Sequence, residues 1–251
     1  MKLHCLGTTG YHPSPTRHTA CYYAPDWNLV LDAGTGIFRL VEHLRRVPKK
    51  HLDLFLTHAH LDHIVGLTFL VDVYAVTDLE SVRVIGDGAK LAAVQEHLFN
   101  DLLFPVKPQM EFCSLDGESG EQKFGETAVE WFPLEHPGGS IGYIMEREGK
   151  RFAYITDTIA RDKASYVERL RGADLLLHEC YFGDEYQELA EKTGHSWISA
   201  VESVVSRTRP KQTVLIHLNP LAETLGNSIE LTEAHQRLGM SISEDCMEID
   251  F

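Results

Sequence analysis

The chain has 251 residues, of which 43 % are hydrophobic and 24 % are charged. This length fits one large domain, and the composition excludes disordered, collagen-like and fibrous proteins. The 23 Lys and Arg residues against 37 Asp and Glu residues leave a net charge of −14, which argues against binding of extended nucleic acid.

The sequence also predicts neither a membrane-spanning segment nor a secretory signal. No uncharged apolar run reaches the ~18 residues that a membrane span needs, so we expect no membrane partner. The first residues, Met1–Gly7, are too short and reach Gly too soon for a secretory signal. The five Cys residues are odd in number and form no CxxC pair. We therefore expect reduced thiols and a cytoplasmic protein.

Short apolar strands alternate with amphipathic helices along the chain. The expected strands are 2–6, 20–24, 28–32, 53–56, 82–86, 128–132, 141–146, 151–156, 175–178 and 213–216. The expected helices are 37–46, 88–98, 163–170, 185–192, 196–206 and 228–238. With no internal repeat and no linker, this order predicts one domain, residues 1–251, of α/β (α+β) class.

Several expected strands end directly in polar residues. Asp32, His58, Asp157 and His217 each follow an apolar run. Polar groups at the ends of buried strands are how α/β proteins build sites on rigid elements. The alternative, that these strands simply turn to solvent, explains four such ends poorly.

The sharpest motif is His58-Ala59-His60-Leu61-Asp62-His63, which directly follows the strand at 53–56. Imidazole and carboxylate together suit zinc, with iron and manganese as alternatives. A strand before the motif and an apolar helical start after it allow all four side chains to aim at one point. Four solvated loop residues are the alternative, but such a density of charge beside a buried strand is costly.

This motif resembles that of the metallo-β-lactamase superfamily, whose fold is a four-layer αββα sandwich with a metal site at one edge. The resemblance covers essentially the whole chain and implies two divalent metal ions. It implies that His58, His60 and His136 hold one ion, and that Asp62, His63 and His217 hold the other. Asp157 would bridge them, and Asp62 would also orient the attacking water or accept a proton from it. Asp32 would hydrogen-bond a ligating His, or would alternatively be an ordinary turn residue.

Glu179 and His195 point to one branch of this superfamily. His178-Glu179 and His195-Ser196 resemble two motifs of ribonuclease Z enzymes, whose acidic residue and His are not metal ligands. This implies that His195 assists the leaving oxygen while Glu179 orients it and keeps it protonated. The alternatives are that His195 sits beside a helix-capping Ser196 and that Glu179 is an exposed strand-end acid.

Two further segments bear on the substrate. The opening Gly7–His18 loop resembles that of the same branch, where backbone amides and Arg17 would contact a phosphate. The segment 71–112 is expected to cover the metal cleft. Its apolar residues 99 and 102–105 either contact a nucleobase or, more simply, pack in the core.

The chain departs from ribonuclease Z in one respect that matters for function. In that enzyme a basic, Gly-rich arm between the third ligand segment and the bridging Asp grips tRNA. Here 20 residues separate His136 from Asp157, enough for one hairpin only. The sequence instead resembles short relatives that act on small or cyclic phosphodiesters.

We therefore expect a dinuclear zinc phosphodiesterase that acts on a small or nucleotide-like diester. Hydrolysis of a carboxylic ester, lactone, β-lactam or sulfate ester at the same metals is an alternative. A second alternative is tRNA 3′ processing with a partner that supplies the grip. A third is a metal-stabilised binding or sensor protein, which the complete ligand set disfavours. The resemblance also implies a homodimer.

Overall fold

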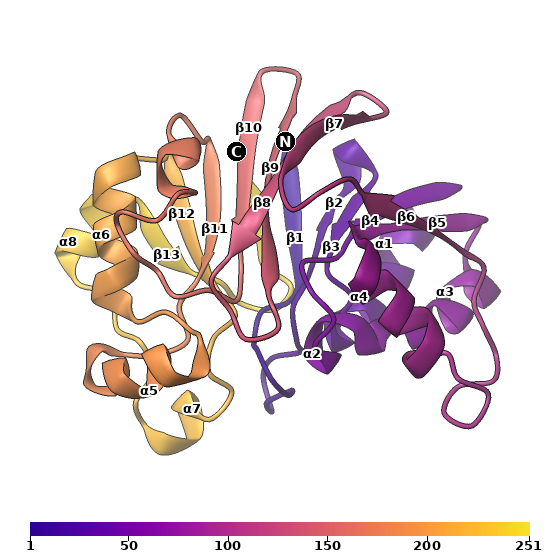
Figure 1. Ribbon diagram of the computed structural model, residues 1–251, viewed down its shortest axis with the longest axis horizontal. Coiled ribbons are helices and arrows are strands. Elements are labelled where there is room, and N and C mark those ends of the chain that lie inside the picture. Colours follow the sequence, from indigo (N-terminus) through magenta and orange to yellow (C-terminus); the bar gives the residue numbers. More distant parts are fainter. The chain divides into compact units, whose positions relative to one another are not determined.

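The computed structural model describes all residues, 1–251, which form two compact units, each built on one sheet (Figure 1). The N-terminal unit comprises Met1–Asp116 and Glu244–Asp250, and the C-terminal unit comprises Gly117–Ser243 and Phe251. Each unit contains a mixed seven-stranded sheet and its own hydrophobic core. None of the helices combines the length and the apolar character that crossing a membrane requires.

The sheet of the N-terminal unit has the strand order β14-β1-β2-β3-β4-β5-β6. Pairing is antiparallel from β14 to β3 and parallel from β3 to β6. The strands are β1 (Lys2–Gly7), β2 (Cys21–Ala24), β3 (Leu29–Leu31), β4 (His51–Phe55), β5 (Ser81–Asp87), β6 (Met110–Leu115) and β14 (Glu248–Asp250). The long strand β1 is thus held between the chain's C-terminal strand and β2.

Short helices cover this sheet and supply its core. They are α1 (Leu40–Arg46), α2 (Leu61–Ile64), α3 (Leu70–Val76) and α4 (Gly88–Ala93), with 3-10 turns at Pro25–Trp27, Thr35–Arg39 and Val65–Phe69 and a π-helical turn at Val94–Leu98. Leu40 and Leu44 of α1, Val73 of α3 and Leu91 of α4 are buried in one cluster with the strands. The leucines of α1 recur four residues apart, as expected of a helix that buries one face.

The sheet of the C-terminal unit has the order β13-β12-β11-β10-β9-β8-β7. Pairing is parallel from β13 to β10 and antiparallel from β10 to β7. The strands are β7 (Gly120–Phe124), β8 (Thr127–Leu134), β9 (Ser140–Arg147), β10 (Lys150–Ile155), β11 (Leu175–Glu179), β12 (Gln212–Ile216) and β13 (Met240–Ile242). Every residue of β11 is buried, which suits a parallel strand covered on both faces.

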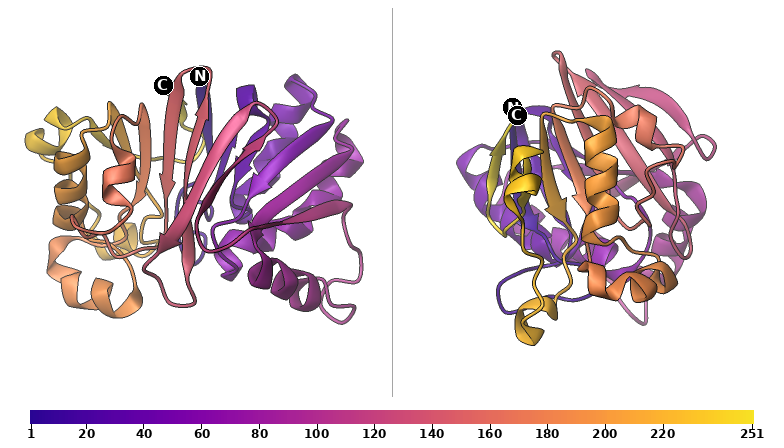
Figure 2. Two further views of the ribbon diagram at one scale, coloured as in Figure 1. Left: turned by 45° about the horizontal axis from the view of Figure 1, so that its top comes forward. Right: turned by 90° about the vertical axis from the view of Figure 1, so that its left-hand side faces the viewer.

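The helices of this unit are α5 (Gln187–Thr193), α6 (Ile198–Thr208), α7 (Ala222–Leu225) and α8 (Glu233–Arg237), with 3-10 turns at Val167–Leu170 and Asp184–Tyr186. The longest, α6, runs alongside the strands of its sheet (Figure 2). It buries Ile198, Val201, Val204 and Val205 in the core of the unit. This spacing places its apolar side chains on one face.

The expected elements agree with the structure wherever the apolar signal is strong. All ten expected strands are present, but β6, β7, β13 and β14 were not expected. β7 is mostly exposed, and β13 and β14 have only three residues each. None of these three strands therefore carries an apolar pattern that the sequence could reveal. The helix expected at 228–238 is wrong in its first turn, because a capping box at Thr232 starts α8 at Glu233. The helix expected at 163–170 is reduced to the 3-10 turn Val167–Leu170.

The segment 71–112 differs from its expected role. It contains β5, an inner strand of the sheet, and so builds the N-terminal unit instead of only covering a cleft. Phe99 is buried in the core and Phe104 packs against it, as the simpler alternative predicted. Leu102 and Leu103 do not pack there and are 94 % and 72 % exposed.

Candidate metal centre

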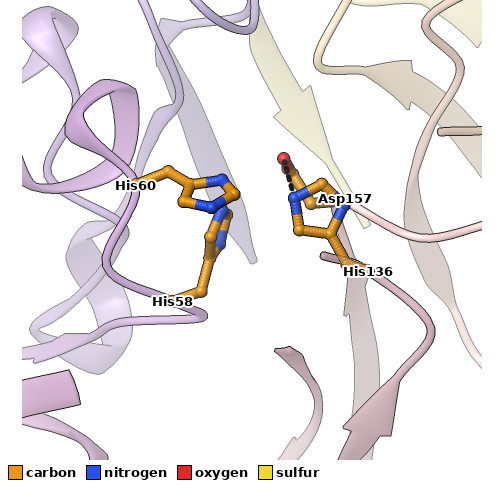
Figure 3. A group of neighbouring side chains, drawn as sticks. All are labelled: His58, His60, His136 and Asp157. Carbon is orange, nitrogen blue, oxygen red and sulfur yellow. Dashed lines mark ion pairs between the residues drawn. The ribbon is translucent and has the colours of Figure 1, made fainter. Parts of the chain in front are cut away.

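Four predicted ligands lie on the segment that joins β4 to α2 in the N-terminal unit. His58 follows the strand, His60 is the residue before α2, and Asp62 and His63 lie within α2. The His58 ring centroid lies 4.4 Å from that of His60 and 4.3 Å from that of His63. Figure 3 shows His58 and His60 at this loop. Imidazoles held this close fit neutral, metal-binding rings better than protonated rings, which would repel one another.

A buried carboxylate fixes two of these rings. His63 Nδ1 lies 2.8 Å from Asp32 Oδ2, and Asp32 is fully buried. The Thr57 hydroxyl donates to Asp32 and lies 3.0 Å from His58 Nδ1, so that Thr57 accepts from His58. The hydrogen bond expected of Asp32 is therefore present. It leaves the lone pair of each ring on Nε2, the pattern by which proteins set the tautomer of a metal-binding His.

Two glycines bring this segment against the turn that follows β3. A Cβ at Gly66 would lie 2.2 Å from the Gly34 carbonyl oxygen, and one at Gly34 would lie 2.4 Å from the Asp62 carbonyl oxygen. The Gly66 amide donates to Ala33 O at 2.7 Å. Asp62 Oδ2 lies 3.4 Å from His63 Nε2 and accepts from the Tyr11 amide at 2.7 Å. Backbone contact of this closeness holds the ligand segment rigidly.

The other three predicted ligands lie in the C-terminal unit, after β8, β10 and β12. Asp157 Oδ2 lies 3.6 Å from His136 Nε2, the pair dashed in Figure 3, and its Oδ1 lies 3.2 Å from His217 Nε2. His136 Nδ1 donates to Gly194 O at 2.9 Å. Burial lowers the pKa of His136, which favours the neutral ring that a metal requires. The structure thus places one carboxylate between two imidazoles.

Three residues of these two groups adopt left-handed backbone conformations. The φ angles are 53° at Asp32, 43° at Asp157 and 52° at His217. Asp32 and His217 directly follow β3 and β12, and Asp157 lies two residues after the end of β10, so the chain turns sharply at the end of each of these strands. Such conformations are uncommon outside glycine and concentrate at functional sites.

Glu179 and His195 form the expected pair within the same unit. Glu179 ends β11 and is fully buried, which excludes the alternative of an exposed strand-end acid. Its carboxylate lies 3.2 Å from His195 Nδ1 and also accepts from the amides of Thr158 and Ser196. Ligand-type atoms of Asp157, His195 and His217 lie within 4.8 Å of one another. The pair therefore lies beside two of the predicted ligands.

Ser196 does not cap α6, so the capping alternative for this motif is wrong. The residue before α6 is Trp197, and no side chain caps the helix. The buried Ser196 hydroxyl instead donates to Thr158 O at 2.7 Å and accepts from the Ala160 amide at 2.9 Å. It fastens the segment that follows Asp157 to the segment that carries His195.

Tyr181 is a neighbour of the site that the sequence did not indicate. Its ring stacks on His195 with a centroid separation of 4.6 Å and an interplanar angle of 17°, and its centroid lies 5.7 Å from that of His217. The available signal was its place two residues after Glu179, at the end of β11. An aromatic ring there limits the orientations open to the His195 imidazole.

Arg17, the residue expected to contact a phosphate, is hydrogen-bonded within the N-terminal unit. Its guanidinium donates to Thr8 Oγ1 at 2.8 Å, and the Thr8 hydroxyl donates to Asp245 at 2.7 Å. Arg39 also pairs with Asp245, whose side chain is 5 % exposed. These contacts tie the N-terminal loop to the segment before β14.

Two proteins named ribonuclease Z are similar to this chain over most of its length. Ribonuclease Z of Archaeoglobus fulgidus is 24 % identical, with 87 % of each chain covered. Ribonuclease Z of Haloarcula marismortui is 23 % identical over 87 % of this chain and 86 % of its own.

Solved structures with the same fold cover the whole chain. The metallo-beta-lactamase fold protein YhfI from Bacillus subtilis has a TM-score of 0.77 at 17 % identity, covering 99 % of this chain and 98 % of its own. The short form of human tRNase Z has a TM-score of 0.73 at 21 % identity, covering 100 % and 99 %. A diphosphatase from the PhnP family has a TM-score of 0.68 at 17 % identity, covering 100 % and 97 %. At these identities the likeness establishes the fold, and it confirms the expected metallo-β-lactamase class.

Residues 27–218 match the beta-lactamase superfamily domain, which is well over half of the 251 residues. The two mixed sheets, the His and Asp clusters compatible with a divalent metal, and the relatives named ribonuclease Z agree with that match. The chain therefore belongs to the beta-lactamase superfamily and is a ribonuclease Z-like, metal-dependent hydrolase.

Proposed function

We propose that the protein is a dinuclear metal-dependent phosphodiesterase that acts on small or cyclic phosphodiesters or nucleotides. The observation that carries this proposal is the buried Glu179 carboxylate at 3.2 Å from His195 Nδ1, beside Asp157 and His217. A proton donor held next to metal ligands suits a reaction with a poor leaving group, such as the alkoxide of an alkyl diester. A β-lactam or activated ester has less need of it.

The donor set fits two divalent ions. In this proposal His58, His60 and His136 would hold one ion, Asp62, His63 and His217 would hold the second, and Asp157 would serve both. The nitrogen and oxygen donors suit zinc, with manganese or iron as alternatives. Support comes from the ring nitrogens of His58, His63 and His136, each of which uses Nδ1 for a protein hydrogen bond. Each ion would have three or four protein ligands and an open position, as in catalytic sites.

The ligands come from both units, so the proposal requires that the two units act as one domain. The superfamily match supports this, because residues 27–218 span the boundary between the units. We accordingly propose one hydrolase domain over residues 1–251.

The roles of the chain's own residues follow from their contacts. Such metal ions, when bound, lower the pKa of water towards neutrality and neutralise phosphoryl oxygens. His195 would pass a proton from Nε2 to the leaving oxygen, because its Nδ1 is committed to Glu179. Glu179 would stabilise the protonated ring through its carboxylate charge. Asp62 would orient the attacking water or accept its proton, held in place by the Tyr11 amide.

The substrate class follows from what the chain lacks between two ligands. Residues 137–156 form the β9–β10 hairpin, with register from Lys150 opposite Arg147 to Tyr154 opposite Tyr143. This hairpin leaves no arm in the segment that carries one in ribonuclease Z. The net charge of −14 also opposes a polyanion. The PhnP-family diphosphatase of the same fold supports a small substrate.

A tRNA 3′ endonuclease is the second candidate function. It is favoured by relatives named ribonuclease Z, such as that of Archaeoglobus fulgidus, of which the chain covers 87 %. It would require a partner that supplies the grip on tRNA.

The test is hydrolysis of bis(p-nitrophenyl) phosphate by the purified protein, with metal analysis of the same sample. Nitrocefin, a lactone, p-nitrophenyl sulfate and precursor tRNA complete the panel. We expect turnover of the diester with about two metals per chain, loss of turnover in Asp157→Ala, and unchanged turnover in His97→Ala, an exposed His. Full metal loading with turnover only of another ester or of tRNA would refute the small-diester assignment.

The proposal also includes the cellular compartment and the oligomeric state of the protein. All five Cys residues are free thiols, which fits a reducing compartment such as the cytoplasm. A homodimer is proposed from family resemblance, and light scattering of the metal-loaded protein tests it.

A further inference from the structure

Backbone hydrogen bonds in the C-terminal unit join the segment after β11 to the segment that carries His195. The amides of Tyr181 and Phe182 both donate to Ser196 O at 3.1 Å. On the other side, the His195 amide donates to Ala190 O of α5 at 2.9 Å. The main chain around His195 is therefore fixed from both directions.

The imidazole of His195 is held less firmly by Glu179 than its backbone is held by its neighbours. Its Nδ1 lies 3.2 and 3.4 Å from the two carboxylate oxygens of Glu179. These distances lie at or beyond the long end of the range of about 2.7–3.2 Å for N–H···O hydrogen bonds. One carboxylate at the edge of a ring also allows the ring to tilt about that contact. Glu179 alone therefore does not set the direction of the other ring nitrogen, Nε2.

The Tyr181 ring supplies a second restraint on this imidazole. It stacks on His195 with a centroid separation of 4.6 Å and an interplanar angle of 17°. The His217 centroid lies 5.7 Å from that of Tyr181 and 5.5 Å from that of His195, so the three rings pack as a triangle. Behind Tyr181 lies Phe182, which is 7 % exposed and contacts the Tyr181 ring edge-on at 4.8 Å. Of the three rings, Tyr181 is the one that is neither a predicted ligand nor the predicted proton donor.

We propose that Tyr181 positions His195 and thereby sets how efficiently the site expels a poor leaving group. Glu179 holds Nδ1 and the Tyr181 ring fixes the plane of the imidazole, so that Nε2 keeps one direction. Stacked aromatic pairs favour one arrangement by about three- to tenfold. Tyr181 is a positioning residue in this role, because it acts through His195. The positioning is independent of the reaction, whereas its effect on the rate rests on the proposed function.

The kinetic test compares methyl phenyl phosphate with methyl p-nitrophenyl phosphate, two diesters that differ in how readily the phenol leaves. In the metal-loaded full chain, Tyr181→Leu should lower kcat for methyl phenyl phosphate about three- to tenfold. Its KM should stay within about twofold of wild type, because the ring acts on the proton donor and not on substrate binding. The kcat for methyl p-nitrophenyl phosphate should change by less than about twofold, because p-nitrophenolate leaves without protonation.

Three further variants separate stacking from a general loss of packing. Tyr181→Phe keeps the flat ring and should keep both rates. Tyr181→Met keeps an apolar side chain without a flat face and should behave like Tyr181→Leu. Tyr186→Leu is the matched control, because Tyr186 is also half-buried and contacts Phe182 at 5.9 Å, while its hydroxyl accepts from Asn227 at 2.9 Å. It should change neither rate.

A double variant tests whether Tyr181 acts through His195. In a His195→Ala protein, adding Tyr181→Leu should cause no further loss with methyl phenyl phosphate, because the ring that it orients is gone. A purely structural role would lower the rate again. Tyr181→Leu that slows both diesters equally, or that slows the His195→Ala protein further, would overturn the proposal.

A measurement without substrate tests the positioning whatever the protein hydrolyses. The His195 Nδ1 proton, identified by its absence in His195→Ala, is followed by NMR in the zinc-loaded full chain, and its exchange with water is measured. Exchange should be at least about threefold faster in Tyr181→Leu than in the wild type, and unchanged in Tyr181→Phe and Tyr186→Leu. Unchanged exchange in Tyr181→Leu would overturn the positioning role. Faster exchange in a protein that hydrolyses neither diester would support that role and refute the proposed function.

Discussion

At the scale of single residues, the surroundings of Glu179 set the chemistry of the site. Its buried carboxylate accepts from the amides of Thr158 and Ser196 and from His195 Nδ1. These contacts hold the carboxylate in place and orient the His195 ring through Nδ1. Nε2 is then the ring atom that would deliver a proton to a leaving oxygen in the proposed reaction.

His195→Ala should lower kcat by about 10²–10⁴ for a diester with an alkoxide leaving group. The loss should be much smaller for bis(p-nitrophenyl) phosphate, because p-nitrophenolate leaves without protonation. Steady-state rates with both substrates check this, and His97→Ala is the matched control. An unchanged rate with the alkyl diester would refute the acid role of His195.

At the scale of elements, the predicted site residues are aligned by strands whose ends meet. β10, β11 and β12 are parallel neighbours, so Asp157, Glu179 and His217 emerge at the same edge of one sheet. In the other unit the segment after β4 is held by backbone contact with the turn after β3. The strand ends and turns thus fix the positions of these side chains, which the residue types alone do not.

Gly66→Ala should destabilise the fold by about 1–3 kcal/mol, because the new Cβ would overlap backbone that cannot move aside. Its metal content should fall as well, since the displaced segment carries Asp62 and His63. Urea unfolding and metal analysis check both effects. Gly88→Ala is the control, because its Cβ would meet mainly the flexible Ser114 hydroxyl. A Gly66→Ala protein with wild-type stability would show that this contact is not needed.

Asp174 ties together the first residues of the parallel strands. It accepts from the Arg151 amide at 2.8 Å and from Lys211 Nζ at 2.6 Å. The hydrogen bond from Lys211 and that from the Arg151 amide lower the pKa of Asp174. The ionised form is thus favoured in the folded state, and its contribution to stability is present at neutral pH.

Asp174→Asn should therefore cost about 1 kcal/mol at pH 7, a modest value because Lys211 is largely exposed. The difference from wild type should shrink as the pH falls below about 4 and vanish below the lowered pKa. Urea unfolding of both proteins at pH 7 and at acid pH measures this. A difference that grows on acidification would contradict the assigned sign.

At the scale of the whole molecule, the net charge and the short segment between His136 and Asp157 argue against a polyanionic substrate. The net charge of −14 is spread over a chain whose segment between His136 and Asp157 is a single hairpin. Neither feature offers the concentrated positive charge that binds a polyanion.

The protein alone should accordingly bind tRNA with a Kd weaker than about 10 μM at physiological salt, and should leave precursor tRNA uncleaved. Filter binding at low and at physiological salt, beside a cleavage assay, checks this. Tight binding that persists at physiological salt would favour the endonuclease candidate over the small-diester assignment.

Much of the fold and of the site followed from local pattern. Strands such as β2 are uninterrupted runs of apolar and aromatic residues, and the ligand-type residues cluster at strand ends, so both were predictable. The edge strands β7, β13 and β14 were not, because strands that are exposed or only three residues long need little apolar pattern. Asp245, which engages Thr8 and Arg39, carried no local signal at all.

The sequence by itself determined the superfamily, because its motifs depend on residue identity and order, and the resemblance predicted the metal ligands and the Glu179–His195 pair. Only the tertiary structure decided that Ser196 is a tie and not a helix cap. It also decided that Arg17 bonds to Thr8 and that the Tyr181 ring stacks on His195. These outcomes depend on which distant backbone and side-chain groups become neighbours, and that is set by packing of the whole chain.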